Sequence, residues 1–379
     1  MKKILITGGS GFIGSSLALK LINKGYEVCV LDNLSPQIHG SDPVKTSLLY
    51  NTIKGKVNFI NGSVTSKDDW IKALEQTEIV VHLAAETGTG QSMYEIKKYV
   101  DVNVGGTAML LDILINRRHS VKKIIIASSR AIYGEGKYEC KEHGVIYPKL
   151  RDKREMLLGN FKCQCPYCNN EIILRKTDEE SKIHPNSIYG ITKQNQEQMI
   201  MLMGKALNIP CVALRYQNVY GPGQSLSNPY TGILSIFSTL LKENKEINIF
   251  EDGKESRDFV YINDVVNATF LAIEKESANF NVYNVGSNEG KNVMQVAEIL
   301  KGAYDSKSKL NVSGNFRIGD IRHNIADINK IEGDLNYKPS FNFNAGIQNF
   351  VEWVLKQENI INTSYEKSMI ELKSKGLFK

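Results

Sequence analysis

A glycine-rich turn near the start of the chain constrains the fold more than any other feature. Residues 3–7 (KILIT) have the continuous apolar pattern of a buried parallel strand, and the sequence GGSGFIG follows directly. An amphipathic segment, expected to be a helix, then runs up to Gly25. Gly8, Gly11 and Gly14 allow a tight turn, close approach of a pyrophosphate and close packing of the helix on the strand. The stretch therefore predicts the first unit of a dinucleotide-binding domain.

An acidic residue after the second expected strand indicates which dinucleotide is bound. The strand YEVCVLD ends at Asp32, whose carboxylate can accept hydrogen bonds from both hydroxyls of a ribose. The same charge would repel a 2′-phosphate, so NAD is expected rather than NADP. A glycine-rich turn without a ligand is the alternative interpretation.

Strands and helices continue to alternate along the first half of the chain. Further expected strands lie at 57–60, 79–85 and 123–128, with helices from about 67 and across roughly 92–118. This alternation predicts a doubly wound parallel sheet, an α/β Rossmann architecture, over residues 1–215. Ligands of such sheets bind beyond the carboxyl ends of the strands, and Ser129 stands at one of these ends. His82, inside a strand, is expected to be a core histidine rather than a catalytic group.

The sequence YGITK at 189–193 is the second feature with a chemical meaning. It heads a helical run to about Asn208, so Tyr189 and Lys193, four residues apart, share one helix face. A phenol ordinarily titrates near ~10, and a fixed ammonium beside it favours phenolate and lowers its pKa. Tyr189 could then exchange a proton with a substrate hydroxyl that also contacts Ser129. The alternatives are a chance YxxxK pattern and a serine that caps a turn.

Tyr189 follows Ser129 by 60 positions, and the segment between them is rich in cysteine. A structureless loop of this length is improbable inside a compact domain, so something should fold it. Cys140 and His143 form one pair with metal-ligand spacing and Cys165 and Cys168 form another, with Cys163 as an alternative ligand. We expect a structural Zn²⁺ in an insertion spanning 138–186, because four protein ligands leave no position for water.

The composition limits the partners that the chain can have. The net charge is +6 over 379 residues, and across 138–188 nine Lys and Arg oppose eight Asp and Glu, so no basic face for nucleic acid is expected. No membrane span is expected either, because no apolar run reaches the necessary length, and glycines interrupt the apolar N-terminus. We expect a cytoplasmic protein.

After residue 215 the alternation of strands and helices is less regular. A smaller mixed α/β domain is expected over 216–379, partly interleaved with the first domain. The charged stretch after about Gln357 is expected to be a solvated helix or tail.

These motifs together resemble the extended short-chain dehydrogenase/reductase superfamily, and within it the nucleotide-sugar epimerases and dehydratases. The matching motifs are GGSGFIG with Asp32, HLAA at 82–85, NVGGT at 103–107, ASSRAIYG, YGITK, LRYQNVYGPG at 214–223, RDFVYINDVV at 257–266 and GDIRH at 319–323. The resemblance implies a smaller domain that holds the sugar nucleotide, and a homodimer through the helices near 92–118 and 190–208.

The resemblance also implies roles for individual residues. The implied catalytic residues are Ser129, Tyr189 and Lys193. The implied NAD contacts are Gly8, Gly11, Phe12, Ile13, Gly14, Asp32, Asn33, Ser63, Val64, Leu83, Ala84, Ala85 and Asn103, together with Tyr189 and Lys193. The implied substrate contacts are Ser129, Arg130, Asn218, Arg257 and Arg322, the last three toward the pyrophosphate.

Two positions help to choose among the reactions of this family. Relatives that catalyse 4,6-dehydration carry an Asp-Glu pair after the serine or threonine, where this chain has Arg130 and Ala131. Neither side chain can act as the acid–base pair of an elimination, so C4 epimerisation is expected. Ser63 stands where relatives commonly carry an Asp near the adenine, which leaves the mode of adenine binding open.

The cysteine-rich segment sharpens the resemblance toward 4-epimerases of dTDP-linked 6-deoxyhexoses, which implies conversion of dTDP-L-rhamnose to dTDP-6-deoxy-L-talose. UDP-hexose 4-epimerase, decarboxylase, 4,6-dehydratase and 4-keto reductase activities remain alternatives on the same scaffold. A NAD-binding regulatory or scaffold protein is the alternative from a different class.

Overall fold

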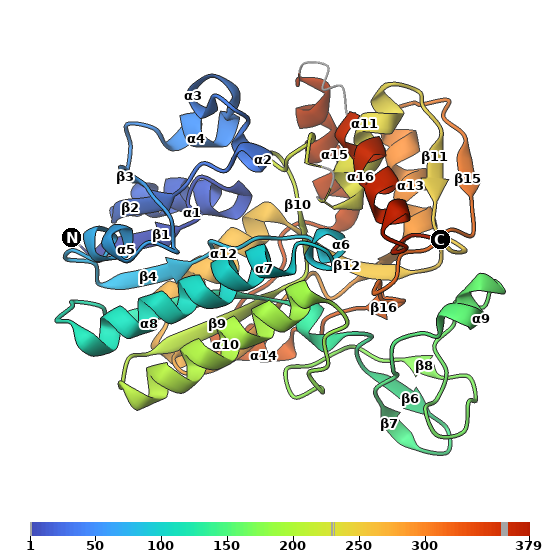
Figure 1. The fold of residues 1–379 in the computed structure, drawn as a ribbon, viewed down its shortest axis with the longest axis horizontal. Helices are drawn as coiled ribbons and strands as arrows, with labels where there is room; N and C mark the ends of the chain where they lie inside the picture. The colour runs from blue at the N-terminus through green and yellow to red at the C-terminus, as the bar shows by residue number, and fades with distance from the viewer. Residues whose placement is uncertain (1, 229, 231, 358–362) are drawn as a thin grey trace.

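Seven parallel strands form the main sheet of the computed structural model, which describes residues 2–228, 230, 232–357 and 363–379 (Figure 1). From one edge to the other they are β3 (Asn58–Asn61), β2 (Glu27–Asp32), β1 (Lys3–Thr7), β4 (Ile79–His82), β5 (Lys123–Ser129), β9 (Cys211–Tyr216) and β13 (Asn281–Val285). The order reverses between β1 and β4, so the carboxyl ends of these strands border a crevice. The predicted doubly wound α/β class is confirmed.

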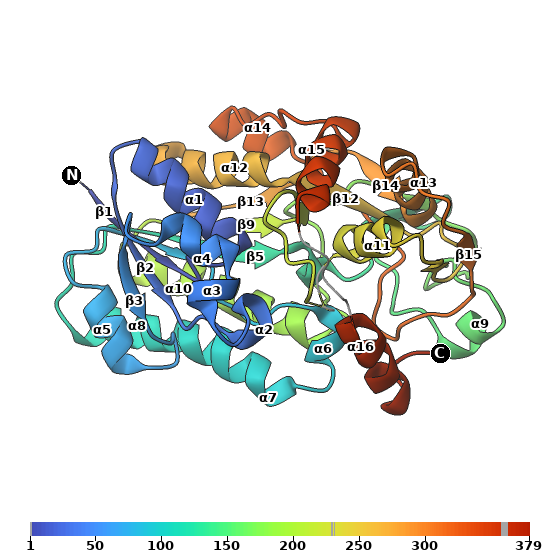
Figure 2. The same cartoon turned by 90° about the horizontal axis from the view of Figure 1, so that it is seen from above.

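Two layers of helices cover the sheet because its strands are apolar on both faces (Figures 1 and 2). Ile4 and Ile6 of β1 join one core while Leu5 joins the other, as the alternation of a strand requires. One layer contains α1 (Phe12–Asn23), α12 (Ile262–Glu274) and α14 (Asn329–Leu335); the other contains α5 (Lys67–Ala73), α8 (Gly106–Asn116) and α10 (Ile188–Ala206).

Short elements join these helices and the strands of the sheet. They are α2 (Pro36–His39), α3 (Pro43–Thr46), α4 (Leu48–Ile53), α6 (Thr89–Ser92), α7 (Ile96–Tyr99), the π-helical turn η1 (Val100–Gly105), and the 3₁₀ turns η2 (Arg130–Tyr133) and η3 (Glu276–Ala278). The helix expected across roughly 92–118 is observed from Ile96 to Asn116 as the contiguous elements α7, η1 and α8. The π-helical turn η1 within it was not predicted, and it carries Asn103, whose side-chain amide is held by the Glu86 backbone.

The second region lies beyond the carboxyl ends of the main strands. Its elements are β10 (Asn218–Tyr220), β11 (Ile247–Ile249), β12 (Ser256–Tyr261), β14 (Gly290–Asn292), β15 (Leu310–Val312), β16 (His323–Asn324), α11 (Ile233–Lys242), α13 (Val293–Ala303), α15 (Phe343–Leu355) and α16 (Thr363–Ser374). The chain passes between the two regions more than once, because β13 returns to the main sheet beside β9. Among the described residues, no helix is long and apolar enough to cross a membrane.

A small antiparallel sheet lies in the segment between Ser129 and Tyr189 and projects from the second region (Figure 1). It is formed by β6 (Tyr138–Cys140), β7 (Gly144–Ile146) and β8 (Ile173–Leu174), and α9 (Lys153–Leu157) lies beside it. We call residues 138–186 the insertion.

The C-terminal segment contains a helix, which is one of the two predicted forms, but this helix is docked on the protein rather than solvated. Residues 358–362 of that stretch lie outside the described residues, but α16 follows them and docks on the protein (Figure 2). Leu372 is only 3% exposed, and the last residues add a short antiparallel bridge in which the Phe316 amide donates to the Lys379 carbonyl. Few apolar residues make this contact, so the helix has little amphipathic pattern.

Candidate active site

A cavity of about 750 Å³ lies at the carboxyl ends of the main strands, between the sheet and the second region. The glycine turn lines one end, Ser129 and Tyr189 line its middle, and Arg257 with α16 lines the other end. All the predicted NAD contacts except Asn103 line it, and so do all the predicted substrate contacts except Arg322.

The glycines let backbone segments of the turn pack directly against each other, and no side chain fills the space where a ligand would bind. A Cβ added to Gly14 would lie 2.3 Å from the Gly8 carbonyl oxygen, and one added to Gly8 would lie 2.9 Å from the Ala84 backbone. Gly11 caps α1, whose first amides therefore point toward the turn. Asp32 accepts hydrogen bonds of 2.9 Å from the Ser10 and Leu34 amides at the end of β2. The turn and its acid fit a dinucleotide diphosphate and ribose.

Three side chains with complementary chemistry meet in the middle of the cavity. Ser129 ends β5, and its hydroxyl accepts a bond of 3.1 Å from the Ala131 amide. Tyr189 lies in the first turn of α10, which Ser187 caps by accepting from the Gly190 amide. Ser129 and Tyr189 both line the cavity, and Ser129 is close enough to lower the pKa of the Tyr189 phenol, so the predicted pair of hydroxyls shares one site. Lys193 follows one turn later and lines the same cavity.

The electrostatics of Tyr189 differ from the sequence-based prediction. The pKa of Tyr189 is raised above its ordinary value, because the effect of burial exceeds the lowering effects of Ser129 and of the positive charge of Arg130. Burial lowers the pKa of Lys193 to about 7. Arg130, which the sequence placed near the substrate, is the cation that lowers the pKa of Tyr189.

A buried chain of hydrogen bonds holds Lys193 in place. Its ammonium donates to Gln196 Oε1 at 2.8 Å, and Gln196 Nε2 donates to Thr107 Oγ1 at 2.8 Å. The same threonine contacts His82 Nε2 at 3.1 Å, and His82 Nδ1 lies 2.7 Å from Thr7 Oγ1. Burial and the charge of Lys193 lower the pKa of His82 to about 3, so the imidazole is neutral. The prediction of a satisfied core histidine is confirmed; Gln196 was not predicted.

Asn103 lies behind the cavity wall rather than in it. The side chain is fully buried and its Oδ1 accepts from the Glu86 amide at 2.8 Å, while Nδ2 donates to the Glu86 carbonyl and to Thr192 Oγ1. The residue therefore joins the loop after β4 to α10, beside Lys193. The expected direct contact with NAD is corrected to a positioning role.

The predicted substrate residues divide into two groups. Arg130 donates from Nε to Asn218 Oδ1, and both line the cavity. Arg257 also lines it, with its guanidinium bonded to the carbonyls of Ser256, Ile321 and Arg322. Within the described ranges no carboxylate forms an ion pair with Arg257. Its charge is therefore free to bind an anion.

Arg322 does not face the cavity, and its predicted role is corrected. The side chain is 4% exposed and ion-paired with Glu251 at 2.9 Å and Asp252 at 2.6 Å. These two carboxylates and that of Glu255, 3.7 Å away, neutralise its charge, and Arg322 holds the loop after β11 in place. Arg317, five residues earlier, lines the cavity instead. Its guanidinium lies 5.0 Å from the Phe250 ring centroid, and its buried Nε has no hydrogen-bond partner among the described residues.

The C-terminal helix completes the far end of the cavity. Tyr365, Ser368 and Leu372 of α16 line it, and Tyr365 shares a hydrogen bond with Arg317. No pattern in the sequence marked these residues, because a charged helix with few apolar positions resembles a solvated one.

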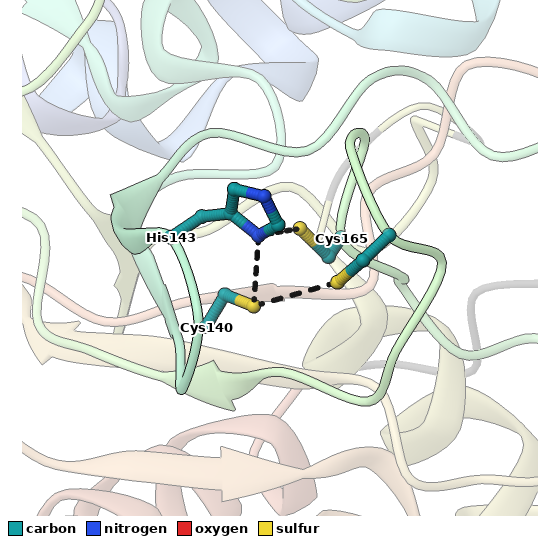
Figure 3. Close-up of side chains that lie close together, drawn as sticks. Cys140, His143 and Cys165 are labelled. Carbon is teal, nitrogen blue, oxygen red and sulfur yellow. Dashed lines mark hydrogen bonds between the residues drawn. The ribbon is translucent and has the colours of Figure 1, made fainter.

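The predicted metal ligands come together outside this cavity, at one end of the small sheet in the insertion. Cys140, His143 and Cys165 point toward one another in Figure 3. The Cys140 and Cys165 sulfurs each lie 3.6 Å from His143 Nδ1, and the Cys140 sulfur lies 3.7 Å from that of Cys168. Cys163 stands apart: its sulfur accepts from the Tyr138 hydroxyl at 3.7 Å.

The chain belongs to the NAD dependent epimerase/dehydratase family, whose profile matches residues 4–155 and 157–286. The predicted resemblance and the predicted NAD-dependent enzyme are confirmed. One relative is dTDP-L-rhamnose 4-epimerase of Burkholderia thailandensis, 36% identical over 94% of this chain and 96% of that protein.

Solved structures agree with this assignment. UDP-glucose 4-epimerase of Thermotoga maritima, with UDP-glucose, is 30% identical with a TM-score of 0.75, over 93% of this chain and 99% of that one. UDP-glucuronic acid 4-epimerase of Bacillus cereus, with UDP-glucuronic acid and NAD, is 26% identical with a TM-score of 0.75, over the same shares of the two chains.

Proposed function

We propose that this enzyme epimerises C4 of a nucleotide-linked sugar, and that its substrate is a dTDP-6-deoxyhexose such as dTDP-L-rhamnose, which gives dTDP-6-deoxy-L-talose. The observation that carries the proposal is the meeting of Ser129, Tyr189 and Lys193 in one cavity with the glycine turn. The similarity to the Burkholderia enzyme supports the choice of sugar.

The side chains divide the chemistry at C4 among them. Tyr189, whose phenolate Ser129 and Arg130 favour, takes the proton of the C4 hydroxyl, and Ser129 holds the same oxygen. Bound NAD⁺ supplies the hydride acceptor and donor for oxidation and re-reduction. Tyr189 returns its proton after the 4-keto sugar has presented its other face, so no cofactor is consumed.

Arg257, Arg317 and Asn218 provide the charge and hydrogen bonds that a sugar-nucleotide diphosphate requires. Arg130 and Ala131 follow Ser129, so the acid–base pair of a 4,6-dehydratase is not at these positions. The two similar epimerase structures carry UDP-sugars, and a UDP-hexose 4-epimerase is therefore the second candidate.

Product analysis tests the proposal. The enzyme is incubated with dTDP-L-rhamnose and, separately, with UDP-glucose and UDP-glucuronic acid, and the products are identified by NMR while NADH is followed by absorbance. We expect conversion of the dTDP-sugar at C4 with no net change in NADH. Tyr189→Phe should reduce turnover by at least about 10³-fold with NAD still bound, whereas exposed Tyr167→Phe should not. Elimination, decarboxylation or net reduction would refute epimerisation.

Three further properties belong to the same proposal. We propose that Cys140, His143, Cys165 and Cys168 bind a structural Zn²⁺, and that the enzyme is a cytoplasmic homodimer joined through α8 and α10. Leu202 of α10 is 68% exposed and Ile115 of α8 is 50% exposed, which supports an apolar contact there. Leu202→Glu should give monomers in sedimentation velocity; an unchanged species would contradict the interface.

A further inference from the structure

The four ligands of the insertion have the dimensions of a closed tetrahedral site. With Zn–S of about 2.3 Å and Zn–N of about 2.0 Å, a tetrahedron has S···S edges of roughly 3.8 Å and S···N edges of roughly 3.5 Å. The structure has an S···S distance of 3.7 Å and S···N distances of 3.6 and 3.6 Å. All four ligand atoms lie within 4.8 Å of one another. The site is thus of the right size for one zinc ion.

Backbone amides surround the sulfur atoms as they do in thiolate sites. The Cys140 sulfur accepts from the amides of Glu142 and His143, and the Cys165 sulfur accepts from those of Tyr167 and Cys168. These bonds stabilise negative sulfur, and they fix the two ligand-bearing turns.

The apolar core around the four ligands is small. Its buried members are Tyr138, Cys140, Ile146, Cys163 and Cys165, while Met156 and Phe161 of the insertion pack in a separate cluster with Phe316. Small domains with cores of this size commonly depend on a metal or disulfides, and no disulfide joins the described cysteines. The metal would therefore contribute the folding free energy of the insertion.

A buried chain of contacts connects the four ligands of the insertion to the cavity. Cys163, two residues before Cys165, bonds to Tyr138 and contacts Glu135, which is fully buried. Glu135 lies 3.3 Å from Nε of Arg151, a residue of the insertion whose side chain is 3% exposed. Ordering of the insertion thus determines where Arg151 lies.

Arg151 fastens two segments of the cavity wall. Its guanidinium makes a bidentate ion pair with the Glu251 carboxylate, with N···O distances of 2.7 and 2.8 Å, and donates to the Asp320 carbonyl at 2.8 Å. Glu251 and Asp320 both line the cavity, and each is close in sequence to an arginine that also lines it, Arg257 and Arg317 respectively. Glu251 also pairs with Arg322, so the loops after β11 and before β16 meet on this one carboxylate.

We infer that the insertion is a zinc-dependent brace of the sugar-nucleotide end of the cavity, which acts through Arg151 and leaves the NAD end unaffected. This inference rests on the proposed function for the identity of the ligand. Zinc takes no part in the reaction, because its four protein ligands close the site.

The test removes the metal from the intact protein and measures the two ends of the cavity separately. Metal content is measured by mass spectrometry before and after dialysis against 1,10-phenanthroline, and affinities for NAD⁺, dTDP and UDP are measured by calorimetry. We expect about one zinc per chain, at least about 10-fold weaker binding of the preferred nucleotide after removal, NAD⁺ affinity within about twofold, and recovery on adding Zn²⁺. Trypsin should then cleave first inside 138–186.

Three variants distinguish the loss of zinc from the loss of the contacts made by Arg151. Arg151→Met should retain zinc but lose nucleotide affinity, while Cys165→Ala should lose both and Cys163→Ala should keep zinc. Zinc removal with unchanged nucleotide affinity would overturn the brace, and a protein that neither contains nor takes up zinc would overturn the metal site. Zinc-loaded protein that binds neither nucleotide nor any nucleotide sugar would instead overturn the proposed function, and the brace with it.

Discussion

The ammonium of Lys193 donates a hydrogen bond of 2.8 Å to the side-chain oxygen of Gln196, one turn further along the same helix. Gln196 is fully buried and is held in turn by Thr107. The position of the ammonium therefore depends on a residue outside the YxxxK pattern.

Gln196→Leu should lower kcat by about 10- to 100-fold, since a hydrogen bond to a charged group contributes about 1.5–3 kcal/mol. Without its acceptor the ammonium is less stable, so the alkaline limb of the kcat profile should move to lower pH. Gln196→Glu keeps an acceptor and should preserve most of the activity. Gln198→Leu, on the exposed side of the same helix, is the control. An unshifted pH profile in Gln196→Leu would show that the glutamine does not position Lys193.

Burial of Lys193 should make the protein less stable at neutral pH than at alkaline pH. The pKa of this lysine falls from 10.5 to about 7 on folding, so between these values the unfolded chain binds more protons than the folded one. Stability should therefore rise with pH through this window as far as Lys193 is concerned. Lys193→Met removes the cost, and we expect it to stabilise the protein by a few kcal/mol at pH 6 and by less at pH 9. Urea denaturation at both pH values measures the difference; an equal gain would contradict the assignment.

Substitutions of three arginines should give two different phenotypes. Arg257→Gln and Arg317→Gln should raise KM for the nucleotide sugar by about 10- to 100-fold with little change in stability, because each removes a charge that faces the cavity. Arg322→Gln should instead destabilise the protein by about 3–5 kcal/mol, because Glu251 and Asp252 lose a buried partner. Steady-state kinetics and thermal unfolding distinguish them, with exposed Arg118→Gln as the control.

The sequence predicted the part of the fold that depends on local pattern. β1 spans the residues 3–7 that were predicted, and α10 begins within one residue of Tyr189, because buried strands and capped helices leave clear signals. The π-helical turn η1 within the helix was missed, since it accompanies contacts of Asn103 with Glu86 and Thr192, which are distant in sequence.

The sequence predicted those residues of the candidate site that belong to recognisable motifs. It predicted less well those residues whose orientation depends on side chains distant in sequence. Gly8, Asp32, Ser129 and Tyr189 meet as expected because the ends of parallel strands converge. Which of Arg317 and Arg322 faces the cavity could not be predicted, because the choice depends on carboxylates about seventy positions earlier.

The C-terminal helix should contribute to substrate binding although its sequence resembles a solvated tail. The Leu372 side chain lies 3.8 Å from the position that a Cβ at Gly90 would occupy, and Tyr365 shares a hydrogen bond with Arg317. Helix α16 therefore closes the cavity end that we assign to the sugar nucleotide. Deletion of 358–379 should therefore raise KM for the nucleotide sugar by at least about 10-fold and leave NAD⁺ affinity unchanged, because the glycine turn lies at the other end. Leu372→Glu should have the same effect, since it places a charge where the native side chain is 3% exposed, whereas Ile370→Glu, at a position 69% exposed on the same helix, should not. Equal kinetics for the two point variants would mean that α16 does not pack on the cavity in solution.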